Sequence, residues 1–238
     1  MFLKKITPKR IKKVYHKMKF YIQKLYFSIF YNVKSFIKIS HKGFYSQYGQ
    51  DYYLEKYVIP SLNNFEGSIV EVGCNDPIYN NNTFFFSKKH KVISIDPLDY
   101  SKEYNKRENT TFVNCAISDE KGIFKYYKVI KKEGWEDQMS GFSKPENHFK
   151  YNIIEVPTNT LNNILIENQV KKISLLILDC EGHEYNILNS FNFNDFNPDV
   201  IVIENKIFGN KIRRLMKENN YSLKYRFWTA DDVYIRKE

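Results

Sequence analysis

Short apolar runs alternate with amphipathic segments through most of this chain. From residue 43 onward, continuous apolar runs such as 174–179 are separated by stretches whose apolar residues recur every three or four positions. Continuous runs are typical of strands buried on both faces, whereas the longer period indicates helices. The pattern predicts strands at 68–72, 91–96, 111–116, 123–129, 174–179 and 200–204, and helices at 50–58, 81–89, 101–107, 160–167, 184–190 and 211–219.

This alternation predicts an α/β domain over residues 43–238, built on a doubly wound, mostly parallel sheet with helices on both faces. Residues 222–227 and 233–236 flank the turn residues 229–232, which predicts a C-terminal hairpin that adds an antiparallel edge. Residues 131–150 are polar and lack periodicity, so we interpret them as a long loop. A loop of this length is either a lid or specificity element, in which Trp135, Phe142 and His148 contact substrate, or a solvated connection.

Residues 1–42 form a separate basic extension. They hold 12 lysine and arginine residues and no acidic residue, and the remaining chain carries 25 basic and 27 acidic residues. Apolar residues recur from Ile11 to Phe36 with helical spacing, which predicts a basic amphipathic helix. Residues 8–38 of this helix would dock on the domain, self-associate or contact an anionic membrane surface. Polar residues interrupt its apolar stretch, so we expect neither a membrane span nor a signal peptide.

Charge and cysteine content narrow the function class. Because the body of the chain is nearly neutral, an extended surface for nucleic-acid phosphates is not expected there. The three cysteines have no metal-binding spacing and indicate free thiols in a reducing compartment, so we expect a cytoplasmic protein, with peripheral contact at a membrane surface as an option.

Residues 68–77, with the sequence SIVEVGCNDP, have the form of a nucleoside-binding loop. A buried strand leads into Gly73, and the next strand ends at Asp96, where a carboxylate accepts hydrogen bonds from ribose hydroxyls. The single glycine does not form the GxGxxG pattern of dinucleotide sites. The loop therefore favours a nucleoside cofactor without a pyrophosphate, and S-adenosylmethionine is the commonest of these.

Ligands of open α/β sheets bind beyond the carboxyl ends of the strands. Four of the five strand ends predicted at that edge are acidic, and converging carboxylates are costly unless they meet a ligand, a cation or helix caps. We assign Glu71 to the amino group of a methionine moiety, Asp96 to ribose, and the backbone of Ala116 and Ile117 to adenine. The predicted cofactor-binding residues are Glu71, Gly73, Asn75, Asp96, Ala116 and Ile117.

Residues 179–184, with the sequence DCEGHE, form the densest group of candidate catalytic residues. Asp179 or Glu181 would accept the proton of a substrate hydroxyl or anchor the substrate. The same two carboxylates would alternatively hold a divalent cation through oxygen ligands, although no metal-ligating set is assigned. Glu184 suits the first turn of a helix. Substrate-contacting candidates are Gln47, Trp135, His183 and Glu204.

Five segments together resemble the FkbM family of S-adenosylmethionine-dependent methyltransferases. They are SQYGQD at 46–51, IVEVGCNDP at 69–77 with NTFFF at 82–86, VNCAISDEKG at 113–122, LLILDCEGHEYNIL at 175–188 and DDVYI at 231–235. Their order and spacing are similar to those of the family from about residue 43 to 236. Pro77 stands where the family usually has glycine.

The resemblance implies a class I, Rossmann-like methyltransferase fold and O-methylation of a hydroxyl on a sugar, glycan or secondary metabolite. The residues leave two other functions open. One is a binding or scaffold protein that keeps this fold without catalysing a reaction. The other is a nucleic-acid methyltransferase that uses the basic extension as an electrostatic arm.

Overall fold

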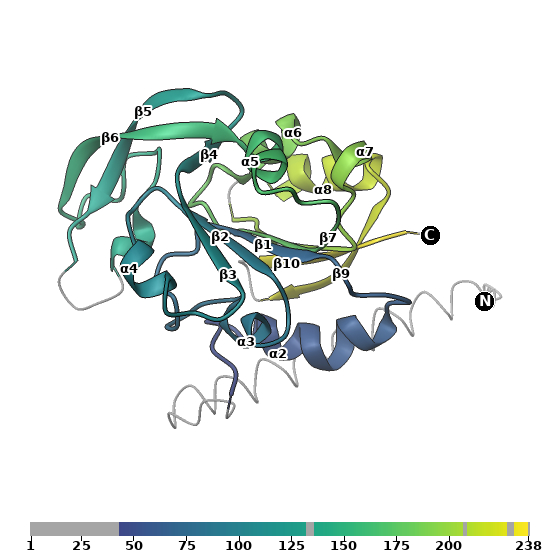
Figure 1. Cartoon of the computed structure of the whole chain (residues 1–238). Helices are drawn as coiled ribbons and strands as arrows, with labels where there is room; N and C mark the ends of the chain where they lie inside the picture. The colour runs from purple at the N-terminus through teal and green to yellow at the C-terminus, as the bar shows by residue number, and fades with distance from the viewer. Residues whose placement is uncertain (1–42, 132–135, 207–208, 228–230, 238) are drawn as a thin grey trace, which may run out of the picture.

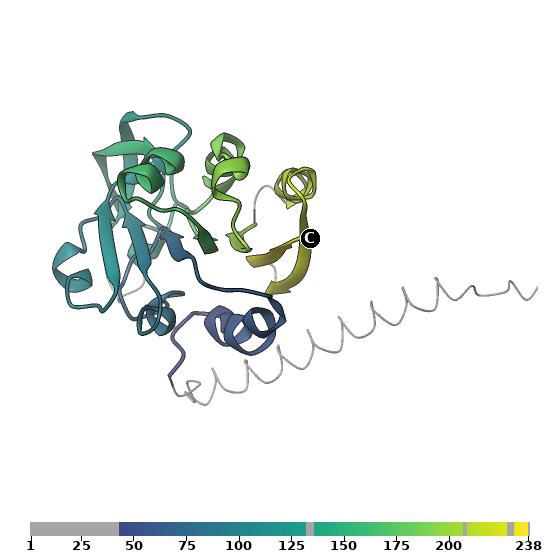
Figure 2. The same ribbon diagram turned by 45° about the vertical axis from the view of Figure 1, so that its right-hand side comes forward.

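The computed structural model describes residues 43–131, 136–206, 209–227 and 231–237. Figures 1 and 2 show a central sheet with helices on two sides and a smaller sheet packed above one end of it. The predicted N-terminal helix, with its proposed partners at residues 8–38, and Trp135 lie outside the described residues.

A seven-stranded sheet forms the centre of the domain, in the order β3-β2-β1-β7-β8-β10-β9. The first five strands in this order are mutually parallel, and β10 is antiparallel to both of its neighbours. The strands are β1 (Ser68–Val72), β2 (Val92–Asp96), β3 (Thr110–Asn114), β7 (Ile173–Leu178), β8 (Val200–Glu204), β9 (Tyr221–Phe227) and β10 (Asp231–Arg236). The mixed α/β class, the mostly parallel sheet and the C-terminal hairpin are confirmed.

The hairpin differs from the prediction in two respects. The strand at the edge is β9, while the antiparallel strand β10 lies between β8 and β9. Asp231 and Asp232, which the sequence placed in the turn, begin β10 and are 6% and 0% exposed. Their acidic side chains are therefore brought inside the protein beside the end of β8.

Both faces of the sheet are covered, as the continuous apolar strands indicate. Val70 and Leu176 pack on one face against α5 (Leu161–Glu167), α6 (Glu184–Ser190), α7 (Phe193–Phe196) and α8 (Gly209–Glu218). Ile69 and Leu175, which point the opposite way, pack against Leu54 and Phe86. Leu54 begins η1 (Leu54–Val58), which continues α2 (Gln50–Tyr53) as a π-helical turn, and Phe86 belongs to α3 (Phe84–Ser87).

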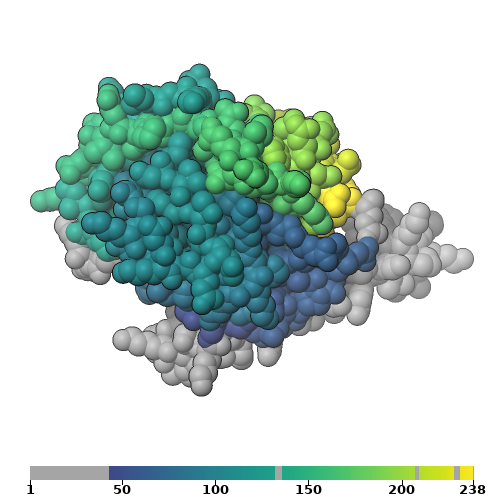
Figure 3. Space-filling model, in the orientation of Figure 1, coloured from purple at the N-terminus to yellow at the C-terminus, as the bar shows by residue number. Residues whose placement is uncertain are grey.

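A second, three-stranded sheet corrects two predictions. It has the order β4-β6-β5 and consists of β4 (Ala116–Ser118), β5 (Gly122–Val129) and β6 (Tyr151–Thr160). Ala116 therefore begins a strand of this sheet and does not end β3. The sequence predicted β5, but it placed no strand at 151–160. Figure 3 shows the teal and green parts of the chain, which include this sheet, as one continuous surface.

The remaining elements are short: η2 (Ile59–Ser61), α4 (Ser101–Tyr104) and η3 (Glu136–Met139). The helix α4 falls within the helix predicted at 101–107, whereas η2 was not predicted and η3 lies in the segment predicted as a loop. The cap of α5 is Thr160, whose hydroxyl accepts the Asn163 N–H at 3.2 Å; the start of this helix was predicted within one residue. The order of the central sheet reverses between β1 and β7, and the crevice beyond two such strands is where open α/β sheets bind ligands.

Candidate active site

A pocket of about 220 Å³ lies at the carboxyl ends of β1, β2, β7 and β8. All six predicted cofactor-binding residues line it, together with Gln47, Asp179, Glu181 and Glu204. Residues 137–140 of the segment predicted as a loop also contribute, as does Phe142. The structure thus brings the sequence-derived candidates together at the reversal of strand order; their individual roles stay predictions.

Gly73 has a structural reason to be glycine. Its φ is +79°, and a Cβ at this position would lie 1.7 Å from the backbone oxygen of Asp179. The N–H of Asp179 in turn donates to the carbonyl of Val72 at 3.0 Å. Any side chain at residue 73 would therefore push the end of β1 away from the end of β7, because no Cβ fits against a backbone atom at that separation.

Glu71 is buried and bonded within the protein. Its carboxylate accepts the Thr83 hydroxyl at 2.5 Å and the Asn82 N–H at 3.2 Å. Burial raises the pKa of Glu71, and these hydrogen bonds act against that rise. Glu71 therefore fixes the turn before α3 at the pocket wall, a contribution that the sequence did not indicate.

Asp96 ends β2 with both carboxylate oxygens facing backbone donors. The N–H of Asn75 and the N–H of Leu98 each donate to one oxygen at 2.9 Å. Burial raises the pKa of Asp96 to about 7. Each oxygen keeps a lone pair, so the carboxylate still offers acceptors toward the pocket it lines.

Ala116 and Ile117 belong to β4, where they pair with Thr158 and Asn159 of β6. Since β4 is the outer strand of its sheet, one edge of its backbone faces away from β6. Both residues line the pocket, and the contact of their backbone with adenine stays a prediction.

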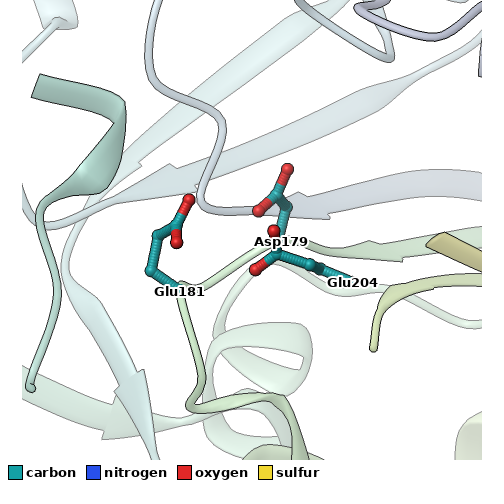
Figure 4. Close-up of side chains that lie close together, drawn as sticks. All are labelled: Asp179, Glu181 and Glu204. Atoms are coloured by element: carbon teal, nitrogen blue, oxygen red, sulfur yellow. The ribbon is translucent and has the colours of Figure 1, made fainter. Parts of the chain in front are cut away.

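Three carboxylates converge at the other end of the pocket (Figure 4). Asp179 follows β7, Glu181 lies in the turn before α6, and Glu204 ends β8; one oxygen from each lies within 4.8 Å of the others. Burial, followed by the charge of Glu204, raises the pKa of Asp179 well above its usual range and that of Glu181 to about 8. Oxygen ligands at this spacing suit a hard divalent cation, and the cation stays an untested alternative.

Lys206 is the one basic residue among those described that line this pocket, and its ammonium group pairs with Glu204. Asp231 lies close enough to the three carboxylates to raise the pKa of both Asp179 and Glu181 by its charge. Burial raises the pKa of Asp231 itself to about 7. The described lining of the pocket is thus rich in carboxylates and holds a single lysine.

The segment SQYGQD forms a wall of the pocket beside this acidic end. Gln47 and Tyr48 line the pocket. The carboxylate of Asp51 accepts the Tyr45 N–H at 2.6 Å and the Ser46 hydroxyl at 2.5 Å, which closes the loop before α2. Gln50 binds the Tyr48 N–H through its side-chain oxygen at 2.9 Å. The buried side chains of Gln50 and Asp51 therefore hold Gln47 and Tyr48 in place at the pocket.

The histidines are placed differently from the predicted substrate contacts. His183 does not line the pocket; its Nε2 lies 3.1 Å from the Ser118 hydroxyl, and its ring packs on Phe142 with centroids 4.5 Å apart. His148 is 65% exposed in its side chain and lies beside Glu146. His183 thus supports a pocket-lining residue, and Glu184 binds the N–H groups of Cys180 and Gly182 at 2.7 and 3.2 Å.

Several lining residues were missed by the sequence reasoning. Tyr48 lies within the SQYGQD segment, whose neighbour Gln47 was singled out, so its position was the available signal. Lys206 follows the acidic end of β8 by two residues. Asp137 and Gln138 lie in the aperiodic segment and carried no signal beyond their polarity.

The methyltransferase FkbM domain model matches residues 71–223, which is more than half of the chain. The chain belongs to the FkbM methyltransferase family. Among solved structures it is similar to the crystal structure of methyltransferase FkbM from Methylobacillus flagellatus KT, at 11% sequence identity and a TM-score of 0.45. That match covers 78% of this chain and 50% of the other, so the chain spans half the length of the solved protein. A comparison with curated proteins gave no match.

Membership of the FkbM family supports methyltransferase activity, and the mixed α/β sheet is consistent with a methyltransferase fold. Pro77, the departure noted in the sequence, is not among the residues that line the pocket. Its carbonyl accepts a hydrogen bond from the Arg107 guanidinium at 3.2 Å. In the part of the chain that the structure describes, no helix is long and apolar enough to cross a membrane.

Proposed function

We propose that this FkbM-family protein is an S-adenosylmethionine-dependent O-methyltransferase with a class I, Rossmann-like fold. Its acceptor is a hydroxyl of a sugar, glycan or secondary metabolite. The observation that carries the proposal is the acidic pocket at the reversal of strand order, in a chain whose family is one of methyltransferases.

The residues present fit the cofactor in charge and in hydrogen bonding. Six carboxylates line the pocket beside one lysine, a balance that favours a ligand with a cationic sulfonium group: Glu71, Asp96, Asp137, Asp179, Glu181 and Glu204. Asp96 offers acceptors for ribose hydroxyls. Glu71 already accepts hydrogen bonds from within the protein. The Oδ1 of Asn82, which is buried and has no hydrogen-bond partner among the described residues, is therefore the better acceptor for an amino group.

S-adenosylmethionine, when bound, supplies an electrophilic methyl group. The chain's own contribution is to orient the acceptor hydroxyl and take its proton. Glu181 suits the role of base because burial raises its pKa to about 8. A general base is most effective when its pKa lies near the pH at which the enzyme works. Asp179, whose backbone is tied to Val72, suits the anchoring of the acceptor.

Isothermal titration of the full chain tests the cofactor. We expect S-adenosylmethionine and S-adenosylhomocysteine to bind with micromolar affinity, and Asp96→Ala to weaken both by tenfold or more, on the order of one charge-assisted hydrogen bond. NAD serves as the control ligand and should not bind. Its pyrophosphate would face the carboxylates of the pocket, and the chain has no glycine-rich loop to hold it. A folded wild-type protein that binds neither sulfur nucleoside would overturn the proposal.

A further inference from the structure

The η3 segment brings to the pocket a carboxylate to which the proposed function assigns no specific contact. Asp137 lines the pocket and is 8% exposed. Its Oδ2 accepts the Tyr100 hydroxyl at 3.2 Å and lies 3.4 Å from the Lys131 ammonium group. Its Oδ1 is buried and has no hydrogen-bond partner among the described residues. A buried carboxylate oxygen without a donor is costly, so this atom calls for a partner from outside the chain.

A chain of hydrogen bonds links Asp137 to Asp96. The Tyr100 hydroxyl that donates to Asp137 accepts the side-chain amide of Asn75 at 3.0 Å. The backbone N–H of Asn75 donates to Asp96 at 2.9 Å. The charge of Asp137 also raises the pKa of Asp96, as two nearby carboxylates require. Asp137 is therefore held at the same end of the pocket as the residue proposed for ribose.

The surroundings of this end are apolar. Leu98, Ala116 and Tyr126 form a small buried cluster, and Phe142 packs against it. All four line the pocket. An apolar wall with a few fixed acceptors is the environment that a flat heterocycle with a sugar requires. A phosphate here would meet two carboxylates, so the site disfavours nucleotides relative to nucleosides.

We propose that Asp137 binds the nucleoside part of the cofactor, with Oδ1 accepting a hydrogen bond from an N–H or O–H group of that nucleoside. The inference rests on the proposed cofactor. The donor is the exocyclic amine of adenine or the ribose 2′-hydroxyl. The η3 segment is then an integral part of the cofactor pocket.

Titration calorimetry on the full chain tests this with three ligands: S-adenosylhomocysteine, its deaminated inosine analogue, and its 2′-deoxy analogue. We expect Asp137→Ala to weaken S-adenosylhomocysteine by about tenfold or more, as for the loss of a hydrogen bond to a charged group. Tyr100→Phe is the matched control, because it removes the neighbouring hydroxyl and leaves Oδ1 in place. Asp137→Val, which fills a similar volume and has no acceptor, replaces Asp137→Ala if that variant does not fold.

An analogue that lacks the hydrogen-bond donor to Asp137 cannot lose that bond, so the Asp137→Ala variant must bind this analogue no worse than it binds S-adenosylhomocysteine. If Asp137→Ala weakens S-adenosylhomocysteine and the 2′-deoxy analogue but not the inosine analogue, the donor is the exocyclic amine. If it weakens S-adenosylhomocysteine and the inosine analogue but not the 2′-deoxy analogue, the donor is the ribose hydroxyl. Either result supports the proposal. Loss of affinity that is equal for all three ligands, or no loss, overturns it while leaving the cofactor assignment intact. Failure of the wild type to bind S-adenosylhomocysteine and S-adenosylmethionine overturns the cofactor assignment and this inference together.

Discussion

The side-chain amide of Gln50 donates a hydrogen bond to the carboxylate of Asp231, 181 residues later in the sequence. Gln50 begins α2 and is 3% exposed, and Asp231 begins β10. The side-chain oxygen of Gln50 accepts a hydrogen bond from the N–H of Tyr48, which lines the pocket. The first and last family-like motifs of the chain thus meet at the acidic end of the site.

Gln50→Leu is expected to lower the free energy of unfolding by about 1–3 kcal/mol, because it leaves a buried carboxylate without its amide donor. Urea unfolding monitored by circular dichroism measures the change. Gln47→Ala in the same loop is the control, since Gln47 lines the pocket and contributes no such bond to Asp231. Equal stability of Gln50→Leu and wild type would show that the bond does not hold the loop.

Gly73→Ala is expected to destabilise the protein by more than 3 kcal/mol and to abolish cofactor binding, because the added Cβ would overlap the Asp179 carbonyl oxygen. Gly43→Ala is a sharp control. Gly43 also has a positive φ, +95°, but a Cβ there meets no atom within 4 Å. It should cost only the backbone strain, about 1–2 kcal/mol. Similar thermal shifts for both variants would contradict the close contact.

Stability should fall as pH rises from about 4 to 8. Burial raises the folded-state pKa of Asp96 to about 7 and of Glu181 to about 8, whereas both titrate near 4 when unfolded. In this window the folded protein holds more protons than the unfolded chain, so the free energy of unfolding decreases with pH. Urea midpoints at pH 5 and pH 8 measure the effect.

Glu181→Gln should reduce this pH dependence and stabilise the protein at pH 8 by about 1 kcal/mol, because it removes one charge from the crowded carboxylates. A midpoint that rises between pH 5 and pH 8 in the wild type would run against the raised pKa values. Glu146→Gln is the control, because that side chain is 80% exposed.

Asp179→Asn and Glu181→Gln should lower the rate of methyl transfer by about 100-fold or more if one of these carboxylates takes the acceptor's proton. Their affinity for S-adenosylhomocysteine should change little. The measurement is a methyl-transfer assay over a panel of hydroxylated glycans and metabolites. Full turnover in both variants would remove these residues from catalysis.

The central sheet was predictable because its strands are apolar on both faces. The predicted ends of β8 and α6 agree with the structure, and those of β7 differ by one residue. The strand β6 was missed because its polar and apolar residues do not alternate regularly and because Pro157 argues against a strand, although Pro157 lies in the ladder opposite Ile123. Pairing with β5 decides this strand, and pairing is not a local property.

Only those residues of the site that lie at strand ends or in the glycine turn could be predicted from the sequence. Asp96, Asp179 and Glu204 could be found because parallel strands place their carboxyl ends at one edge. The sequence also gave no sign that Asn82 and Thr83 donate hydrogen bonds to Glu71 inside the protein. Asp137 could not be found, because only tertiary packing reveals that its Oδ1 is buried and has no hydrogen-bond partner in the described part of the chain.

The contact between Gly73 and the Asp179 carbonyl also distinguishes a floor of the pocket that tolerates no substitution from walls that can be varied. The floor tolerates no added atom at Gly73. The walls come from the SQYGQD loop and the η3 segment, whose pocket-facing side chains include Gln47 and Gln138. A search for variants that accept a new hydroxyl compound should therefore randomise these wall positions and leave the floor untouched.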